Sequence, residues 1–173
     1  MSMMMSETMH DDMMTRRAWV GMLAKAFGAG ALLTATRPLS SDAMAMAPAL
    51  PRITVYKDPS CGCCTKWVAH LRASGLQPDV HDRSDMDVLK DSLGVPATLR
   101  SCHTAVVGRY VIEGHVPASD MQRLVAAAPK GIIGLAVPGM PAGSPGMEVP
   151  GRTDRYDVIA FASDGTTKLF AHH

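Results

Sequence analysis

Residues 52–75 read RITVYKDPSCGCCTKWVAHLRASG, and this stretch decides the fold. β-Branched residues after Pro51 predict a strand over residues 52–56. Asp, Pro, Ser and Gly in the segment 58–62 predict a turn. Apolar residues at helical spacing predict a helix from about residue 63 to residue 74, and Gly75 ends it. The stretch therefore predicts a strand that passes through a cysteine-bearing turn into a helix.

The segments after Gly75 continue this alternation of strands and helices. The predicted elements are a strand at 77–81, a helix at 85–93, strands at 97–107 and 109–113 turning at Gly108, and a helix that starts at 117–120. Strand, helix, strand, helix, strand, strand, helix is the thioredoxin-like order, and that fold keeps its active site where these cysteines stand. By the same likeness, Pro96 is expected to form a cis peptide bond facing the cysteines.

The C-terminal part departs from this pattern. Residues 138–150, PGMPAGSPGMEVP, form a long Pro/Gly loop that carries Met140 and Met147. Residues 156–162 and 166–171, around Ser-Asp-Gly, predict a closing hairpin. We therefore expect an α/β, thioredoxin-like domain with a C-terminal Pro/Gly/Met loop and a β-hairpin.

Length and composition limit the class of protein. The chain has 173 residues, of which 47% are hydrophobic and 19% charged, a balance that excludes wholesale disorder. Its formal net charge is +1 and aromatic residues make up 5%. A nucleic-acid-binding protein is excluded, because a basic patch requires more positive charge and a base-stacking platform requires more aromatic residues.

The first 47 residues have the pattern of an export signal. Thr15-Arg16-Arg17 precedes a weakly apolar stretch that Lys25 interrupts, and this stretch is too short for a membrane span. The paired arginines resemble the twin-arginine signal, with an ordinary secretory signal as the alternative. Alternating small residues predict cleavage after Ala45 or Ala47. We expect residues 1–47 to be signal and linker, and residues 48–173 to be a periplasmic domain without a stable membrane span.

All four cysteines lie beyond this signal, at positions 61, 63, 64 and 102. A Cys-x-x-Cys at a helix start first suggests a thiol–disulfide oxidoreductase, with Cys61 as nucleophile and Cys64 as resolving thiol, because the helix dipole stabilises a thiolate. The additional Cys63 would compete in that exchange. Two structural disulfides, or a zinc site, are further alternatives.

A soft metal would protect crowded thiols in an oxidising compartment. Thiolate and thioether ligands together select Cu(I). Met140 and Met147 stand in a loop with few apolar neighbours, so burial explains them poorly. His103 and His115 follow or end predicted strands and are candidate ligands from the same end of the sheet. The other four candidates have solvent, structural or tail positions: His70, His81, His172 and His173.

Several ordered motifs together resemble one family. They are VYK (55–57), CGCC (61–64), KWV (66–68), GVP (94–96), SCHTAVV (101–107), EGHVPA (113–118), GMP (139–141) and GSPGME (143–148). They resemble the CopG-type periplasmic copper-resistance proteins over about residues 52–171.

The resemblance implies a thioredoxin-like domain that binds several copper ions in a cysteine-bridged cluster. Carried over by motif, the expected thiolate ligands are Cys61, Cys63, Cys64 and Cys102. The outer ligands that it implies are His115, Met140 and Met147, with His103 as a further candidate. It also implies a redox role, either oxidising Cu(I) or passing copper on to a periplasmic carrier or efflux system.

Overall fold

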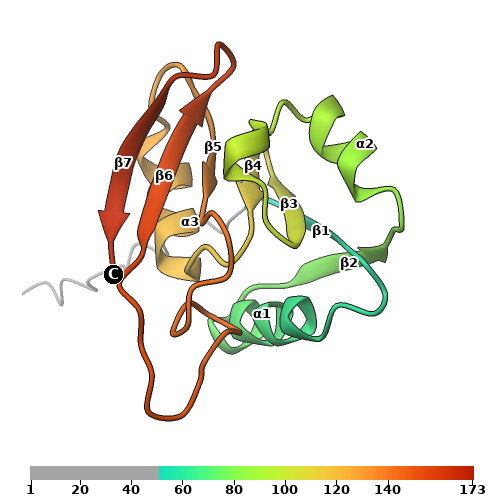
Figure 1. The fold of residues 1–173 in the computed structure, drawn as a ribbon. Coiled ribbons are helices and arrows are strands. Elements are labelled where there is room, and N and C mark those ends of the chain that lie inside the picture. The colour runs from blue at the N-terminus through green and yellow to red at the C-terminus, as the bar shows by residue number, and fades with distance from the viewer. Residues whose placement is uncertain (1–50) are drawn as a thin grey trace, which may run out of the picture. The chain divides into compact units, whose positions relative to one another are not determined.

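A computed structural model describes residues 51–173, so the predicted export signal lies outside the described residues. Figure 1 shows a single mixed sheet with helices on it. The strands are β1 (Ile53–Lys57), β2 (Pro78–Asp82), β3 (His103–Val107), β4 (Tyr110–Glu113), β5 (Ile132–Ala136), β6 (Asp157–Ala162) and β7 (Thr167–His172). The helices are α1 (Gly62–Ala73), α2 (Met86–Ser92), the 3₁₀ turn η1 (Ala97–Leu99) and α3 (Ala118–Ala127).

The seven strands lie in the order β2-β1-β3-β4-β5-β6-β7. β1 runs parallel to β2 and antiparallel to β3, and β4 runs antiparallel to β3 and parallel to β5. The last three strands are antiparallel neighbours. In this register Lys57 at the end of β1 stands opposite His103 at the start of β3, so the cysteine-bearing turn after β1 lies near Cys102.

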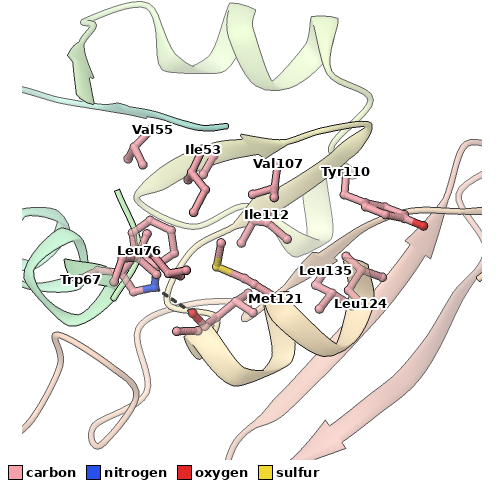
Figure 2. Close-up of a cluster of buried hydrophobic side chains, with 14 of the residues drawn as sticks. Ile53, Val55, Trp67, Leu76, Val107, Tyr110, Ile112, Met121, Leu124 and Leu135 are labelled. Atoms are coloured by element: carbon pink, nitrogen blue, oxygen red, sulfur yellow. Dashed lines mark hydrogen bonds between the residues drawn. The ribbon is translucent and has the colours of Figure 1, made fainter. Parts of the chain in front are cut away.

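One face of the sheet packs against α1 and α3. Figure 2 shows this core, where Trp67 from α1 and Met121 and Leu124 from α3 meet Ile112 and other sheet residues. Trp67 is fully buried, and its indole Nε1 donates a hydrogen bond of 2.9 Å to the carbonyl of Val116. Burying the apolar ring stabilises the fold, and this bond satisfies its one polar group.

A second, smaller cluster lies on the opposite face of the sheet. Val95 and Leu99, from the segment after α2, pack there against Val111, Ala136 and Phe161. Both faces of the central strands are therefore covered, which explains why β4 is buried along its whole length.

The structure confirms the predicted element order from β1 to α3 and the closing hairpin of β6 and β7. β5 was missed, because Gly134 weakens its strand signal. A Cβ at Gly134 would lie 2.2 Å from the carbonyl oxygen of Val111 and 2.4 Å from the Phe161 ring, so glycine is required there. Among residues 51–173, no helix is long and apolar enough to cross a membrane.

Two local predictions were wrong. Residues 97–99 form η1, and the strand begins only at His103. Pro96 does not form a cis bond, since no peptide bond within the described part of the chain is cis. Its backbone is extended (φ −56°, ψ 135°) and starts η1, which the more stable trans isomer allows.

Candidate metal centre

The fold gathers the four cysteines from two segments of the chain. Cys61 is the N-cap of α1, where its sulfur accepts a hydrogen bond from the backbone N–H of Cys64. Cys63 and Cys64 stand in the first turn of α1. Cys102 comes just before β3, which pairs with β1. The sulfur atoms of all four cysteines lie within 4.8 Å of one another.

Two of these cysteines are joined and two are free. A disulfide links Cys61 and Cys64, whereas Cys63 and Cys102 are free thiols. The Cys63 Sγ lies 3.5 Å from that of Cys61 and 3.7 Å from that of Cys102. The alternative of two structural disulfides requires Cys63 and Cys102 to be bonded as well, and they are in contact without that bond. The Cys63 sulfur thus lies between the sulfurs of Cys61 and Cys102 and contacts both.

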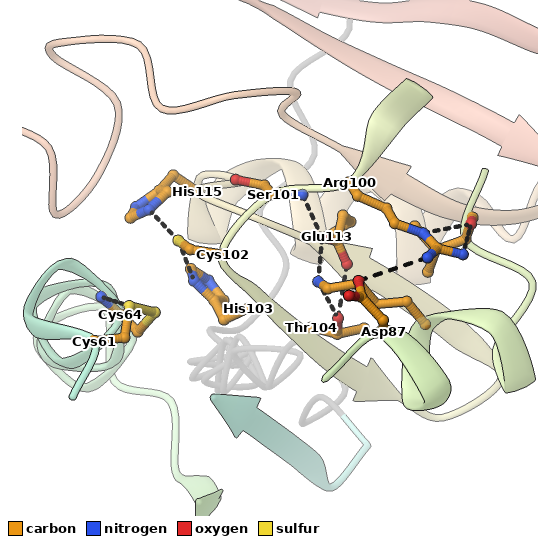
Figure 3. A network of polar contacts seen from close by, with 12 residues as sticks. Cys61, Cys64, Asp87, Arg100, Ser101, Cys102, His103, Thr104, Glu113 and His115 are labelled. Carbon is orange, nitrogen blue, oxygen red and sulfur yellow. Dashed lines mark hydrogen bonds and ion pairs between the residues drawn. A yellow bond between two sulfur atoms is a disulfide. The ribbon is translucent and has the colours of Figure 1, made fainter. Parts of the chain in front are cut away.

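His115 brings an imidazole to the same place. It is fully buried, and its Nε2 lies 3.0 Å from the Cys102 Sγ (Figure 3). Its Nδ1 lies 2.7 Å from the carbonyl oxygen of Pro145, which can only accept. This contact places the proton on Nδ1 and leaves the Nε2 lone pair facing the sulfur, which is the arrangement of a metal-ligating histidine.

His103 is the second imidazole at Cys102. Its Nδ1 lies 3.4 Å from the Cys102 Sγ. Its ring centroid lies 4.3 Å from the ring centroid of Trp67 and 4.9 Å from that of His115. Its Nε2 is the one buried side-chain nitrogen or oxygen among residues 51–173 that has no hydrogen-bond partner. Cys102, His103 and His115 thus form a second group whose candidate ligand atoms lie within 4.8 Å of one another.

Burial sets the protonation of these groups. It lowers the pKa of His103 well below its usual value, and the positive charges of His115, when protonated, and of Lys90 add to the effect. Burial also lowers the pKa of His115. Both rings are therefore neutral at neutral pH, the form that binds metals. Burial, followed by the neighbouring Cys63, raises the pKa of the Cys102 thiol to about 12, so without a metal this sulfur holds its proton.

The segments that carry the two loop methionines contact the cysteine region in different ways. The Ser101 hydroxyl donates to the carbonyl of Gly139, which ties the Met140 loop to the Cys102 segment, while the Met140 side chain is 55% exposed. The backbone before Met147 packs against α1. A Cβ at Gly146 would lie 2.7 Å from the backbone nitrogen of Trp67 and 3.0 Å from the carbonyl oxygen of Cys63. The fold therefore brings both loop segments to the cysteine region.

The remaining histidines have structural or surface contacts. His70 Nε2 accepts a hydrogen bond of 3.1 Å from the backbone N–H of Ala118, where α3 begins. His81 is half-exposed beside Asp79, and His172 is exposed beside Asp157. His173 pairs with Asp120 at 2.7 Å. The contacts of His70, His81 and His172 agree with the structural and surface positions expected from the sequence, whereas His173, expected only as part of a tail, holds the buried Asp120 carboxylate and stacks on Tyr156.

A polar group behind Cys102 was not predicted from the sequence. Glu113 and Lys90 form a buried ion pair, and Glu113 also accepts a hydrogen bond of 2.6 Å from the Ser101 N–H. A charged residue at the end of the apolar strand YVIE was the available signal. The partner Lys90 could not be identified, because it comes from a helix 23 positions earlier. The Pro145 carbonyl that orients His115 was missed for the same reason of distance along the chain.

This set of donors fits a thiophilic metal. Deprotonated cysteine sulfurs together with neutral imidazoles suit Cu(I), and zinc and iron share part of that preference. Sulfurs within 4.8 Å of one another can share metal ions, so the arrangement is a cysteine-centred candidate metal site on a mixed α/β domain.

Comparison with known proteins gives the family. Two solved structures of copper resistance protein CopG, form 2 and form 1, are each 42% identical to the chain and cover 72% of it and 98% of their own chains, with TM-scores of 0.68 and 0.67. A family described as a protein of unknown function, DUF411, matches residues 99–147. A comparison with curated protein sequences finds no match. The chain belongs to the CopG family of copper resistance proteins, and its cysteine cluster supports a copper-related role.

Proposed function

We propose that this protein is a periplasmic copper-binding protein of copper tolerance. In this proposal, residues 1–47 direct export by the twin-arginine route, and a thioredoxin-like domain holds several copper ions in a cysteine-bridged site. The proposed ligands are Cys61, Cys63, Cys64, Cys102, His115, Met140 and Met147.

One observation carries the proposal: Cys102 is shared by two donor groups. Its sulfur lies among the three α1 cysteines on one side and beside His103 and His115 on the other. A single sulfur that contacts both groups can bridge ions held by each. Copper is cargo here, and the CopG structures are those of a copper resistance protein.

The first test is native mass spectrometry of the reduced protein, offered Cu(I) and Zn(II) together without oxygen. Several copper ions per chain are expected. The matched control is Cys63→Ser. It removes the sulfur that contacts both Cys61 and Cys102, so the number of copper ions per chain should fall. A single zinc ion, or no metal, would overturn the proposal.

Redox cycling of the bound copper is the second part of the proposal. Each Cu(I) would give one electron to dioxygen, which yields Cu(II) and superoxide. A periplasmic carrier or efflux system would then remove the Cu(II), and fresh Cu(I) would refill the site. The measurement is Cu(I) oxidation in air by the loaded protein. A rate no faster than that of buffered Cu(I) alone would reject this part while leaving copper binding intact.

A thiol–disulfide oxidoreductase is the alternative function. The observation in its favour is the Cys61–Cys64 disulfide at the start of α1, where the helix N-terminus would stabilise a Cys61 thiolate. Against it, Cys63 lies 3.5 Å from Cys61 and can intercept the exchange. Insulin reduction that survives Cys63→Ser and Cys102→Ser would favour this alternative.

A further inference from the structure

A buried ion pair lies directly behind the proposed metal site. Glu113, at the end of β4, is fully buried, and Lys90, from α2, is 3% exposed. The Lys90 Nζ donates to a Glu113 oxygen and, at 2.9 Å, to the Thr104 hydroxyl, which in turn donates to the other Glu113 oxygen at 2.7 Å. Replacing a buried ion pair by apolar residues is often neutral for stability, so stability alone is a poor reason for this pair.

The same carboxylate also holds the backbone that carries the metal site. Its Oε1 accepts a hydrogen bond of 2.6 Å from the N–H of Ser101, the residue before Cys102 (Figure 3). The Ser101 hydroxyl donates to the Gly139 carbonyl, next to Met140. One residue thus links the buried carboxylate, the Cys102 segment and the methionine loop.

Contacts with Gly114 restrict the backbone around Ser101 and Cys102 to a small range of positions. The Gly114 N–H donates to the His103 carbonyl at 2.9 Å, and Gly114 has a φ of +70°. A Cβ at Gly114 would lie 2.6 Å from the Ser101 Cβ and 2.7 Å from the Val137 carbonyl oxygen. The segment from Glu113 to His115 is therefore packed against Ser101. A shift of Ser101 would also displace the candidate metal ligands Cys102 and His115.

We propose that Glu113, held by Lys90, is a positioning residue for the metal site: its carboxylate fixes the Ser101 backbone and thereby places Cys102 beside Cys63 and His115. This inference rests on the proposed copper-binding function. Its physical basis is preorganisation, since groups behind the ligands of a metal site orient them and reduce the ordering that binding requires.

Two double variants separate positioning from charge. Lys90→Met with Glu113→Gln removes both charges and keeps an amide oxygen for the Ser101 N–H. Lys90→Met with Glu113→Leu removes both charges and that acceptor. Neither leaves an unpaired buried charge, which would by itself destabilise the fold. Cu(I) affinity is measured by competition with a chromogenic chelator, together with the ultraviolet thiolate-to-copper absorption band.

The Gln double variant should bind Cu(I) within about twofold of wild type, and the Leu double variant roughly 10–100-fold more weakly with an altered absorption band. Asp120→Asn is the matched control, because Asp120 is a buried carboxylate (4% exposed) that pairs with Arg123 and His173 instead of the site. This control should keep wild-type affinity and absorption even where the free energy of unfolding falls.

Ser101→Gly provides a second route if the Leu double variant does not fold. It leaves the buried ion pair in place, loosens the backbone of residue 101 and removes the hydroxyl that bonds to the Gly139 carbonyl, so copper affinity should fall several-fold and further than in Ser101→Ala, which removes the hydroxyl alone. Wild-type affinity in Ser101→Gly or in the Leu double variant, or equal losses in the Gln and Leu variants, would overturn the positioning role alone. Failure of wild-type protein to bind copper would overturn the proposed function and this role with it.

Discussion

The Nε2 of His115 lies 3.0 Å from the Sγ of Cys102, and both side chains belong to segments that end or begin central strands of the sheet. The opposite nitrogen of the same ring is bonded to the Pro145 carbonyl. The methionine loop therefore determines that Nε2 is the ring nitrogen whose lone pair is free to bind a metal. In the proposed copper site, binding at His115 and the position of this loop would therefore be coupled through one ring.

We expect His115→Asn to lower Cu(I) affinity by about tenfold or more, on the scale of ligand-environment changes in metal sites. Asn keeps an N–H that can donate to the Pro145 carbonyl but has no nitrogen at the position of Nε2. Chelator competition measures the affinity. His70→Gln is the control, because its amide oxygen can still accept from the Ala118 N–H and His70 belongs to neither group of candidate ligands. Equal affinity in both variants would argue against His115 as a ligand.

Met147→Leu should reduce Cu(I) affinity more than Met140→Leu. The segment before Met147 rests on the first turns of α1, and Met147 is partly buried, whereas Met140 is 55% exposed and any copper it holds exchanges with solvent. Loss of one thioether is expected to cost about tenfold. Met121→Leu, a volume-conserving change of a fully buried core methionine, should leave affinity unchanged. A larger effect at Met140 would contradict this ranking.

Gly146→Ala should destabilise the fold and weaken copper binding together. Gly146 has a φ of +85°, and its added Cβ would meet α1 backbone atoms at 2.7 and 3.0 Å. We expect the free energy of unfolding to fall by about 2–4 kcal/mol, combining the left-handed backbone penalty with overpacking. Urea denaturation measures the change.

Gly139→Ala is the matched control for Gly146→Ala. Gly139 also has a positive φ, +68°, but nothing lies within 4 Å of its added Cβ. Only the backbone penalty of about 1 kcal/mol applies, and copper affinity should change little. Similar losses in the two variants would show that contact of the loop with α1 is unimportant.

Copper capacity should depend on the oxidation state of the cysteines. The disulfide between Cys61 and Cys64 withholds two sulfurs, because thiolates are the metal ligands. Protein reduced with a phosphine should therefore bind more Cu(I) per chain than untreated protein, as counted by native mass spectrometry. A Cys61→Ser/Cys64→Ser variant should bind the same smaller number in both states. Equal counts for oxidised and reduced wild type would refute this expectation.

The local pattern of the sequence determined much of the scaffold. Hydrophobic spacing and turn residues predicted the element order from β1 to α3, and the spacing of Cys61, Cys63 and Cys64 predicted sulfurs at the start of α1. These features depend on neighbours within a few residues, so they are encoded locally. β5 was not predicted, because its Gly134 weakens the local strand pattern. Glycine is required there by the close approach of Val111 and Phe161, which are distant in the sequence.

The assembly of the candidate site depends on contacts between segments far apart in the chain. Strand register brings Cys102 to Cys63 across 39 positions, and the Pro145 carbonyl selects the His115 tautomer across 30. The Lys90–Glu113 pair reaches Ser101 through contacts between a helix and two strands. The sequence by itself supplied the donors and their chemistry. Their mutual distances and protonation depend on packing and burial, which arise only when distant segments fold together.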